Sequence, residues 1–415
     1  MHIAKVIVEN GAIQKMPAIL TEFSITGPVM LVADNHTYRV AGVDVRKILV
    51  INGFQVRDLI LHRHESLIPD EKALGQILAV AEPGITALVA VGSGTITDLT
   101  RFIAYQLNKP FIAVATAPSM DGYASPVAAL TINGFKRTMI AKPPVAIIAD
   151  LDILVKAPLE MIRSGFGDLL GKYTALADWK LSSMITGEDY SKAIAAKVRE
   201  TVERTVAGLQ GEINSVETIR NLTEGLIVSG EAMLLWGNSR PASGAEHHLA
   251  HFWEMKTALH GKKCRLHGIK VGVATVLVTE IYQRLFCMTT GELKHWISRY
   301  RPEQKSDYAA RIHKTFGPLA GEVLADLKES FLDPEKRAAR QDRILANWEE
   351  MRSWTKSNLP TPGIVKSLLQ ATGAPLSPKG IGINRSLLKE SLENAKEIRE
   401  RYTVFRLMED ISLIV

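Results

Sequence analysis

The first 155 residues alternate short apolar runs with amphipathic stretches, and this alternation limits the possible folds more than any other feature of the sequence. Strands buried on both faces of a parallel sheet are apolar throughout, and amphipathic stretches between them are typical of crossover helices. The apolar runs cover residues 29–34, 55–61, 86–92, 111–117 and 145–150. We therefore predict a Rossmann-like α/β domain with a parallel sheet over residues 1–155.

The pattern changes after Pro158, where long helical periodicities replace the short apolar runs. A chain of 415 residues is too long for one compact core, so two domains are expected. We predict an all-helical second domain over residues 156–415. Its last part is rich in charged residues, and the sequence assigns no chemistry to it.

Composition and charge exclude several classes of protein. Fifty basic and 44 acidic residues give a net charge of +6, and the basic residues are spread along the chain. This distribution favours small anionic ligands over nucleic acid. Two cysteines without a CxxC pair exclude a disulfide scaffold and fit a reducing compartment. The N-terminus lacks a signal-peptide pattern and no apolar run has the length of a membrane span, so we expect a cytoplasmic protein.

Histidines are concentrated in one short segment. His247 and His251 are four residues apart and would share one face of a helix, and His267 follows on the next predicted helix. Imidazoles on two antiparallel helices can bind one divalent ion, although surface or capping histidines would give the same pattern. Asp168 would supply an oxygen ligand, although an aspartate in the first turn of a helix is also a common N-cap. An Asp-His-His set leaves coordination positions for substrate.

Two loops that follow predicted strands could bind a nucleotide. Residues 92–98, GSGTITD, lie between a strand and a helix, where backbone amides can approach a diphosphate. The spacing is an incomplete GxGxxG, and a tight turn without a ligand remains an alternative. Residues 116–125, TAPSMDGYAS, carry small hydroxyl side chains and one carboxylate, which suit a nicotinamide or sugar-like ligand as well as a plain capped turn.

Six segments together resemble the superfamily of iron-containing alcohol dehydrogenases and dehydroquinate synthases. They are VADNHTYRVAG, VGSGTITDLTR, TAPSMDGYAS, GFGDLLGKYTALADW, SGAEHHLAHFWE and LHGIKVG. Within the superfamily they are most similar to the bacterial branch that interconverts dihydroxyacetone phosphate and sn-glycerol 1-phosphate by hydride transfer. The resemblance implies the fold of that superfamily, with the site in a cleft between the α/β and the helical domain.

The resemblance also implies roles for individual residues. Asp168, His247 and His267 would be the metal ligands, and His251 and Asp121 would contact the substrate. Asp34 would lie near the adenosine ribose. The rest of the dinucleotide would be held by Gly94, Thr95, Ile96, Thr97, Asp98, Thr116, Ala117, Pro118, Ser119 and Ser125. His248 and His260 match no functional position.

The implied cofactors are NAD or NADP and one divalent metal, zinc or nickel, with iron as a further option. A divalent ion at the C2 oxygen of the substrate would favour hydride transfer to the nicotinamide. The substrate would be a small phosphorylated triose or glycerol, and a homodimer is expected. Candidate partners of the phosphate are Lys136, Arg137, Lys142, Arg240, Lys262 and Lys263. Alternatives within the superfamily are a glycerol or polyol dehydrogenase and a cyclase like dehydroquinate synthase.

Overall fold

The computed structural model describes residues 3–62, 67–133, 135–209, 211–259, 265–326 and 332–413. The predicted bystander His260, the candidate phosphate ligands Lys262 and Lys263, and Cys264 lie outside these ranges.

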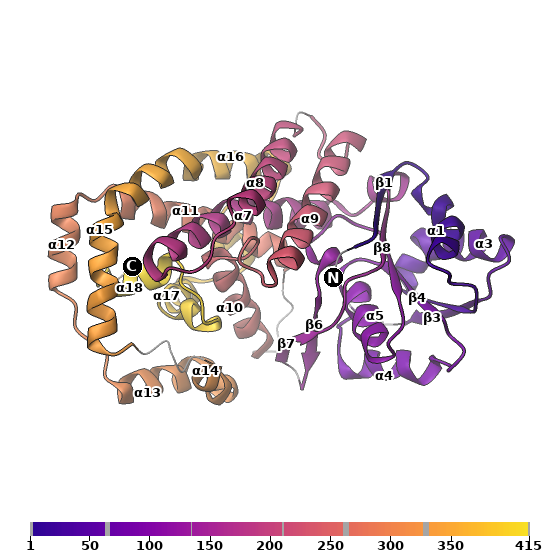
Figure 1. The fold of residues 1–415 in the computed structure, drawn as a ribbon, viewed down its shortest axis with the longest axis horizontal. Coiled ribbons are helices and arrows are strands. Elements are labelled where there is room, and N and C mark those ends of the chain that lie inside the picture. The colour runs from indigo at the N-terminus through magenta and orange to yellow at the C-terminus, as the bar shows by residue number, and fades with distance from the viewer. Residues whose placement is uncertain are drawn as a thin grey trace. The chain divides into compact units, whose positions relative to one another are not determined.

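Six parallel strands form the central sheet in the order β1-β8-β5-β4-β2-β3 (Figure 1). A two-stranded antiparallel hairpin, β6 and β7, is separate from it. The strands are β1 (Lys5–Glu9), β2 (Val29–Asp34), β3 (Val56–Leu61), β4 (Ala87–Gly92), β5 (Phe111–Ala115), β6 (Val127–Ile132), β7 (Phe135–Ile140) and β8 (Ala146–Asp150).

In the part of the chain that the structure describes, the helices α1 to α18 accompany these strands, and no strand follows Leu151. The shorter ones in the first part are α1 (Met16–Glu22), α2 (Asn35–Thr37), α3 (Val43–Ile51), α4 (Glu71–Val80), α5 (Gly94–Gln106) and α6 (Leu151–Leu154). They are followed by α7 (Leu159–Thr186), α8 (Lys192–Ala207), α9 (Val216–Trp236), α10 (Ala245–Leu259), α11 (His267–Phe286) and α12 (Thr290–Ser298). The last six are α13 (Lys305–Phe316), α14 (Ala320–Asp326), α15 (Pro334–Asn358), α16 (Pro362–Thr372), α17 (Arg385–Asn394) and α18 (Val404–Asp410).

The predicted fold class is confirmed, with differences at the ends of elements. The strand β1 was not predicted, because its five residues are only partly buried and it lies at the edge of the sheet. The helical segment after β2 begins directly at Asn35. Asp34 Oδ1 accepts hydrogen bonds from the backbone N–H groups of His36 and Thr37, which starts the helix directly at the end of the strand.

Contacts divide the chain into two compact units. The first contains residues Met1–Leu169 and Glu200–Asn238, and the second contains Leu170–Arg199 and Ser239–Val415. Helices α7 and α8 are continuous across the division.

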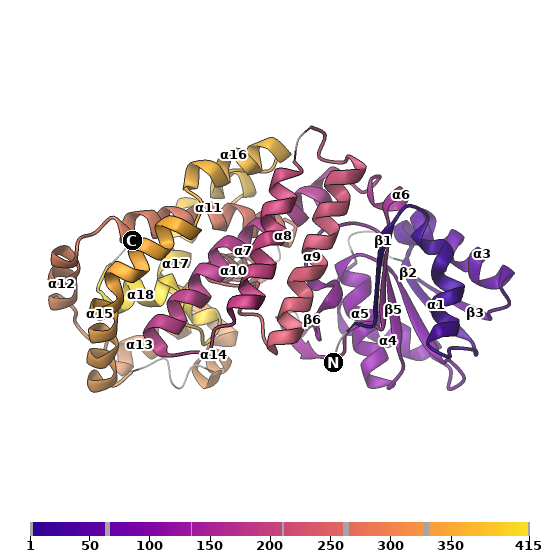
Figure 2. The same ribbon diagram turned by 45° about the horizontal axis from the view of Figure 1, so that its top comes forward.

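The sheet of the first unit is buried on both faces. One face, with Val29, Leu31 and Ala33 of β2, packs in a core with α1 and α3. Helix α5 contacts β4, β2 and β5, and α4 contacts β3 and α5 (Figure 2). Alternate residues of a strand point to opposite faces, which is why the central strands are apolar at every position.

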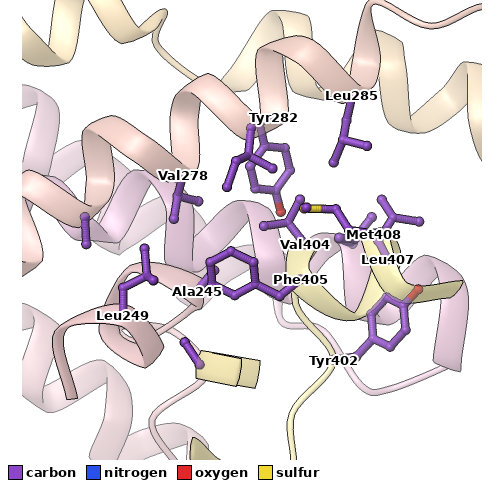
Figure 3. Close-up of a cluster of buried hydrophobic side chains, with 14 of the residues drawn as sticks. Ala245, Leu249, Val278, Tyr282, Leu285, Tyr402, Val404, Phe405, Leu407 and Met408 are labelled. Carbon is purple, nitrogen blue, oxygen red and sulfur yellow. The ribbon is translucent and has the colours of Figure 1, made fainter. Parts of the chain in front are cut away.

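The core of the second unit includes residues of α10, α11 and the C-terminal helix α18. Figure 3 shows Leu249 of α10 and Tyr282 of α11 near Phe405 of α18, all within one buried cluster. The C-terminal segment, for which the sequence indicated only charged helices, therefore supplies part of the core against which α10 and α11 pack.

The buried carboxylate of Asp178, on α7, joins three segments of this core. Its Oδ2 accepts a hydrogen bond from the backbone N–H of Ala245 at 2.6 Å. Its Oδ1 accepts from the hydroxyl of Tyr282 and from the backbone N–H of Val404, both at 2.7 Å. Asp178 thus connects the start of α10 with α11 and α18.

Among the described residues, no single helix is long and apolar enough to cross a membrane. Helices α11 and α12 meet that criterion only as a pair, with a bend of 101° between them.

The first prediction concerns Asp178. Burial, followed by the negative charge of Glu246, raises the pKa of Asp178 to about 7. The folded protein therefore holds this proton more tightly than the unfolded chain, so the stability contribution is complete below pH ~4 and is lost as pH rises to 7. Between these pH values the free energy of unfolding of the wild type should fall by about 1.4 kcal/mol per pH unit because of Asp178. The Asp178→Asn variant should lack this part of the pH dependence, because asparagine does not titrate.

Denaturant titrations of the metal-free protein between pH 4.5 and 8 measure this slope. Asp342→Asn, on the exposed face of α15, is the control. Equal slopes for the wild type and Asp178→Asn would contradict the shifted pKa.

Candidate active site

Asp168 lies in the interior of α7, close to the loop that follows β5. Helix α7 begins at Leu159, so the expectation that Asp168 occupies the first turn is wrong, and the N-cap alternative is excluded. Asp168 is fully buried, and its Oδ2 accepts a hydrogen bond from the backbone N–H of Asp121 at 3.0 Å. The preceding Gly165 permits this close approach, because a Cβ there would lie 1.9 Å from the carbonyl oxygen of Pro118.

Three imidazoles gather on α10 and α11. The ring centroids of His247 and His267 are 5.3 Å apart, and His251 lies 5.8 Å from His247 and 5.2 Å from His267. His247 and His251 share a face of α10 because they are one turn apart, as the spacing predicted. His267 is the first residue of α11.

Each of the two predicted histidine ligands is held by a glutamate. Glu246 Oε1 is 2.7 Å from Nδ1 of His247, and Glu254 Oε1 is 2.8 Å from Nδ1 of His267. A carboxylate at Nδ1 fixes the tautomer and ring orientation, which leaves Nε2 as the atom for a metal. Neither glutamate belongs to the site predicted from the sequence. Glu254 follows His247 by seven residues and could have been placed on the same helix face.

Glu246 is itself firmly positioned, although it is completely buried. Its carboxylate also accepts hydrogen bonds from the hydroxyl of Thr174 and the backbone N–H of Gly244, both at 2.6 Å. Burial opposes ionisation, but the hydrogen bond and charge of His247, with these further donors, hold the pKa of Glu246 below its usual value. Glu246 is therefore an anion under ordinary conditions.

The structure brings the three predicted ligands together. One ligand atom each from Asp168, His247 and His267 lie within 4.8 Å of one another. Asp168 is one residue from the division between the units, and the helix that carries it runs unbroken into the second unit. One carboxylate oxygen and two imidazole nitrogens at this spacing fit a divalent ion such as zinc.

His251, Glu254 and His267 also have ligand atoms within this distance. Glu254 Oε1 is hydrogen-bonded to His267 and lies 3.0 Å from Nζ of Lys270. Glu254 is therefore better suited to orient His267 than to bind an ion.

His248, which matched no functional position, is completely buried beside this site. Burial first, and then the positive charges of Arg401, Arg399, Arg240 and Arg406, lower the pKa of His248 well below its usual value. His248 is therefore a neutral imidazole.

The residues predicted to hold the diphosphate form the start of α5, directly after β4. Thr97 is completely buried, and its hydroxyl has no hydrogen-bond partner within the described chain. Asp98 Oδ1 accepts a hydrogen bond from Arg101 at 2.7 Å, and its Oδ2 accepts one from the backbone N–H of Ala129. Burial raises the pKa of Asp98 to about 6, against the charge of Arg101. The Asp98 side chain therefore connects α5 with β6.

The loop predicted to surround the nicotinamide is tightly packed. Ser119 shares a hydrogen bond of 2.6 Å with Ser93, and its carbonyl oxygen accepts one from the hydroxyl of Ser164 at 3.0 Å. Ser125 bonds to both the N–H and the carbonyl oxygen of Val127. The carboxylate of Asp121 accepts a hydrogen bond from the hydroxyl of Ser229 on α9 at 2.9 Å.

Asp34 and the start of α5 lie at the carboxyl ends of two neighbouring strands. Strand β2 pairs with β3 on one side and with β4 on the other, so the strand order reverses between β2 and β4. Open α/β sheets bind ligands at such a switch point, beyond the carboxyl ends of the strands. This position is where the sequence predicted the dinucleotide.

Only one of the described phosphate candidates lies in the same unit as the histidines. Arg240 Nε is 2.6 Å from Glu188 Oε1, and its guanidinium also donates to the carbonyl oxygen of Tyr402. Lys136, Arg137 and Lys142 lie on or just after β7 in the first unit.

Comparisons with known proteins agree with this architecture. A model of the iron-containing alcohol dehydrogenase family matches residues 7–158. The solved glycerol dehydrogenase of Schizosaccharomyces pombe has a TM-score of 0.63 and 17% identity, with 100% of this chain and 89% of that chain covered. At this identity the likeness concerns the fold, which is that of the iron-containing alcohol dehydrogenases.

The sequence relatives define the family more narrowly. A protein of Halalkalibacterium halodurans is 36% identical over 95% of this chain and 89% of its own length. One of Geobacillus thermodenitrificans is 32% identical over 100% of this chain and 94% of its own. Both are named glycerol-1-phosphate dehydrogenase, NAD(P)+. The chain belongs to the glycerol-1-phosphate dehydrogenase family.

The second prediction tests the role of Glu254. Glu254→Gln keeps the shape of the side chain but removes the charge that orients His267 and increases its basicity. We expect the metal dissociation constant to rise about 10- to 100-fold. Competition with a chromogenic chelator measures it.

Glu280→Gln is the matched control, because Glu280 lies on the same helix as His267 and pairs with Lys366 at the surface. Unchanged metal affinity in Glu254→Gln would contradict the assignment.

Proposed function

We propose that this chain is a metal-dependent, NAD(P)-linked dehydrogenase that interconverts dihydroxyacetone phosphate and sn-glycerol 1-phosphate. The observation that carries the proposal is the convergence of Asp168, His247 and His267, with each imidazole held by a glutamate. Membership in the glycerol-1-phosphate dehydrogenase family supports the substrate pair.

Asp168, His247 and His267 would hold the ion. Three protein ligands leave coordination positions for substrate, which is typical of a catalytic site and not of a closed structural one. A divalent ion, when bound, supplies a Lewis acid at the C2 oxygen of the substrate. The set of donors is compatible with zinc, nickel or iron.

The switch point of the sheet supports a dinucleotide cofactor. The N-terminus of α5 presents backbone N–H groups toward the carboxyl ends of the strands, and its first turn contains no acidic residue. We propose that Gly94 to Asp98 hold the diphosphate through the backbone of this turn. The nicotinamide would lie near Thr116 to Ser119 and Ser125.

His251 and Asp121 are the proposed substrate contacts. The His251 ring lies among the ligand rings without belonging to the Asp168 set, so it can donate to or accept from a substrate oxygen. The backbone N–H of Asp121 donates a hydrogen bond to the carboxylate of Asp168. The carboxylate of Asp121 accepts a hydrogen bond from the hydroxyl of Ser229, which fixes its position beside Asp168. The expected homodimer and cytoplasmic location stay predictions.

The proposed activity is tested by following NADH and NADPH oxidation with dihydroxyacetone phosphate. The protein is first stripped with a chelator and then supplied separately with Zn²⁺, Ni²⁺ or Fe²⁺. Activity that depends on an added ion is expected. A preference for glycerol over its 1-phosphate in the reverse direction would instead identify a glycerol or polyol dehydrogenase.

The third prediction is that His267→Ala loses metal and turnover together. Two remaining protein ligands hold an ion poorly, whereas the partly exposed first residue of α11 contributes little to the core. Metal content by mass spectrometry and the thermal unfolding midpoint measure the two effects.

His295→Ala, an exposed histidine on α12, should retain both metal and activity. Full turnover by His267→Ala would remove His267 from the ligand set.

The fourth prediction concerns cofactor choice. A carboxylate near the adenosine ribose repels the 2′-phosphate of NADP, so Asp34→Ser should raise the kcat/KM with NADPH relative to NADH. Serine can still cap α2, which keeps the local backbone in place. Steady-state kinetics with both cofactors measure the ratio, and an unchanged ratio would place the adenosine ribose away from Asp34.

A further inference from the structure

Two arginines from the C-terminal segment lie against the loop that precedes α10. Arg401 donates to the carbonyl oxygen of Ser243 and, at 2.9 Å, to the hydroxyl of Ser239. Arg399 donates to the same hydroxyl at 3.2 Å. Arg399 and Arg401 are separated from these serines by about 160 residues of sequence, so no local sequence pattern connects them.

The negative charges of Glu188, Glu246 and Glu254 compensate this pair of arginines only at longer range than a direct ion pair. In the described part of the chain, neither Arg399 nor Arg401 has a carboxylate within ion-pair distance, whereas the nearby Arg240 pairs with Glu188. Burial, followed by the charges of Arg240 and Arg399, lowers the pKa of Arg401. Crowded, partly buried cations of this kind favour a bound anion.

Buried polar groups without partners lie beside the arginines. The hydroxyl of Ser243 and both ring nitrogens of His248 make no hydrogen bond to any described residue. Ser243 is 5% exposed and His248 is completely buried. Buried polar atoms are nearly always satisfied, so these groups indicate a ligand or water that belongs at this place.

We propose that Arg399 and Arg401, together with Ser243, bind the phosphate group of the substrate. This proposal rests on the proposed function, because it assigns the phosphate end of the same substrate. Guanidinium groups bind phosphate oxygens bidentately, and a serine hydroxyl can donate a further hydrogen bond.

The position relative to the ligand histidines supports a substrate phosphate. Ser243 precedes His247 by four residues, and the N-terminus of α10 lies between them and favours negative charge. Burial lowers the pKa of Arg399, and the charge of Glu254, which orients His267, opposes that effect. Arg401 contacts the loop that leads into the helix of His247.

The test uses the metal-loaded protein and the variants Arg399→Gln and Arg401→Gln. Inorganic phosphate binding is measured by calorimetry, which requires no turnover. Each variant should weaken phosphate binding, and raise the KM for dihydroxyacetone phosphate, about 10- to 100-fold, because one charged hydrogen-bonding partner is lost. The KM for NADH should change little, and Arg401→Lys should recover part of the loss.

Arg343→Gln is the matched control, because Arg343 also donates to a backbone carbonyl oxygen, that of Ile185, at 3.3 Å. Thermal unfolding midpoints identify any variant that fails to fold, and the charge-retaining Arg401→Lys then carries the comparison. A purely structural role would lower stability in Arg399→Gln and Arg401→Gln without changing the KM for dihydroxyacetone phosphate.

The remaining outcomes separate this proposal from the proposed function. Unchanged phosphate affinity and unchanged KM in an active enzyme would overturn the phosphate site and leave the dehydrogenase function intact. Phosphate binding that depends on Arg399 and Arg401 in a protein inactive with dihydroxyacetone phosphate would retain the anion site and refute the proposed substrate. A KM increase confined to NADPH would assign the arginines to the 2′-phosphate of the cofactor and overturn the proposal.

Discussion

The hydrogen bonds of the Asp178 carboxylate are the constraint on which the histidine site depends. Its two oxygens accept from Ala245, Tyr282 and Val404, which belong to the start of α10, to α11 and to α18. His247 follows Ala245 by two residues, and His267 begins the helix that contains Tyr282. Burying a carboxylate is costly in free energy unless hydrogen-bond donors satisfy it. Separating any of the three segments would leave an oxygen of Asp178 with fewer donors, so these hydrogen bonds hold the segments together. The positions of the His247 and His267 imidazoles therefore depend on how Asp178 joins α10 and α11.

The sequence predicts the α/β fold well because the strands of a sheet that is buried on both faces are apolar at successive positions. Strand β4 is buried at all six positions, and its apolar run has the bounds of the strand within one residue. Strand β1 lies at the edge of the sheet, and Ile7 is its one buried residue, so its apolar run is too weak to identify from the sequence. The glycines around Asp168 resemble a helix start in sequence, whereas in the structure Gly165 allows α7 to contact the backbone of Pro118.

The sequence predicts those parts of the candidate site in which residues of one helix lie close together, and it does not predict contacts between distant segments. His247 and His251 share a helix face by spacing alone, and the same periodicity places Glu254 beside them. The contact of Glu246 with Nδ1 of His247 depends on side-chain conformation between adjacent residues, which spacing does not encode. Arg399 and Arg401 reach Ser239 and Ser243 only through the tertiary fold. In sequence these arginines resemble ordinary surface charges of a polar helical region, and only their burial distinguishes them.

The arrangement of charge around α10 suits a ligand with two different ends. The arginines that contact the loop before α10 offer positive charge for a phosphate, and the set of Asp168, His247 and His267 fits a cation. Ser243 precedes His247 by four residues, and the N-terminus of α10 lies between them. In a three-carbon phosphate the phosphorus and the C2 oxygen are only a few bonds apart, so one small molecule can contact both places. A glycerol without phosphate would leave the buried Ser243 hydroxyl without a partner and bring no anion to the arginines, and the energetic penalty would then discriminate against it.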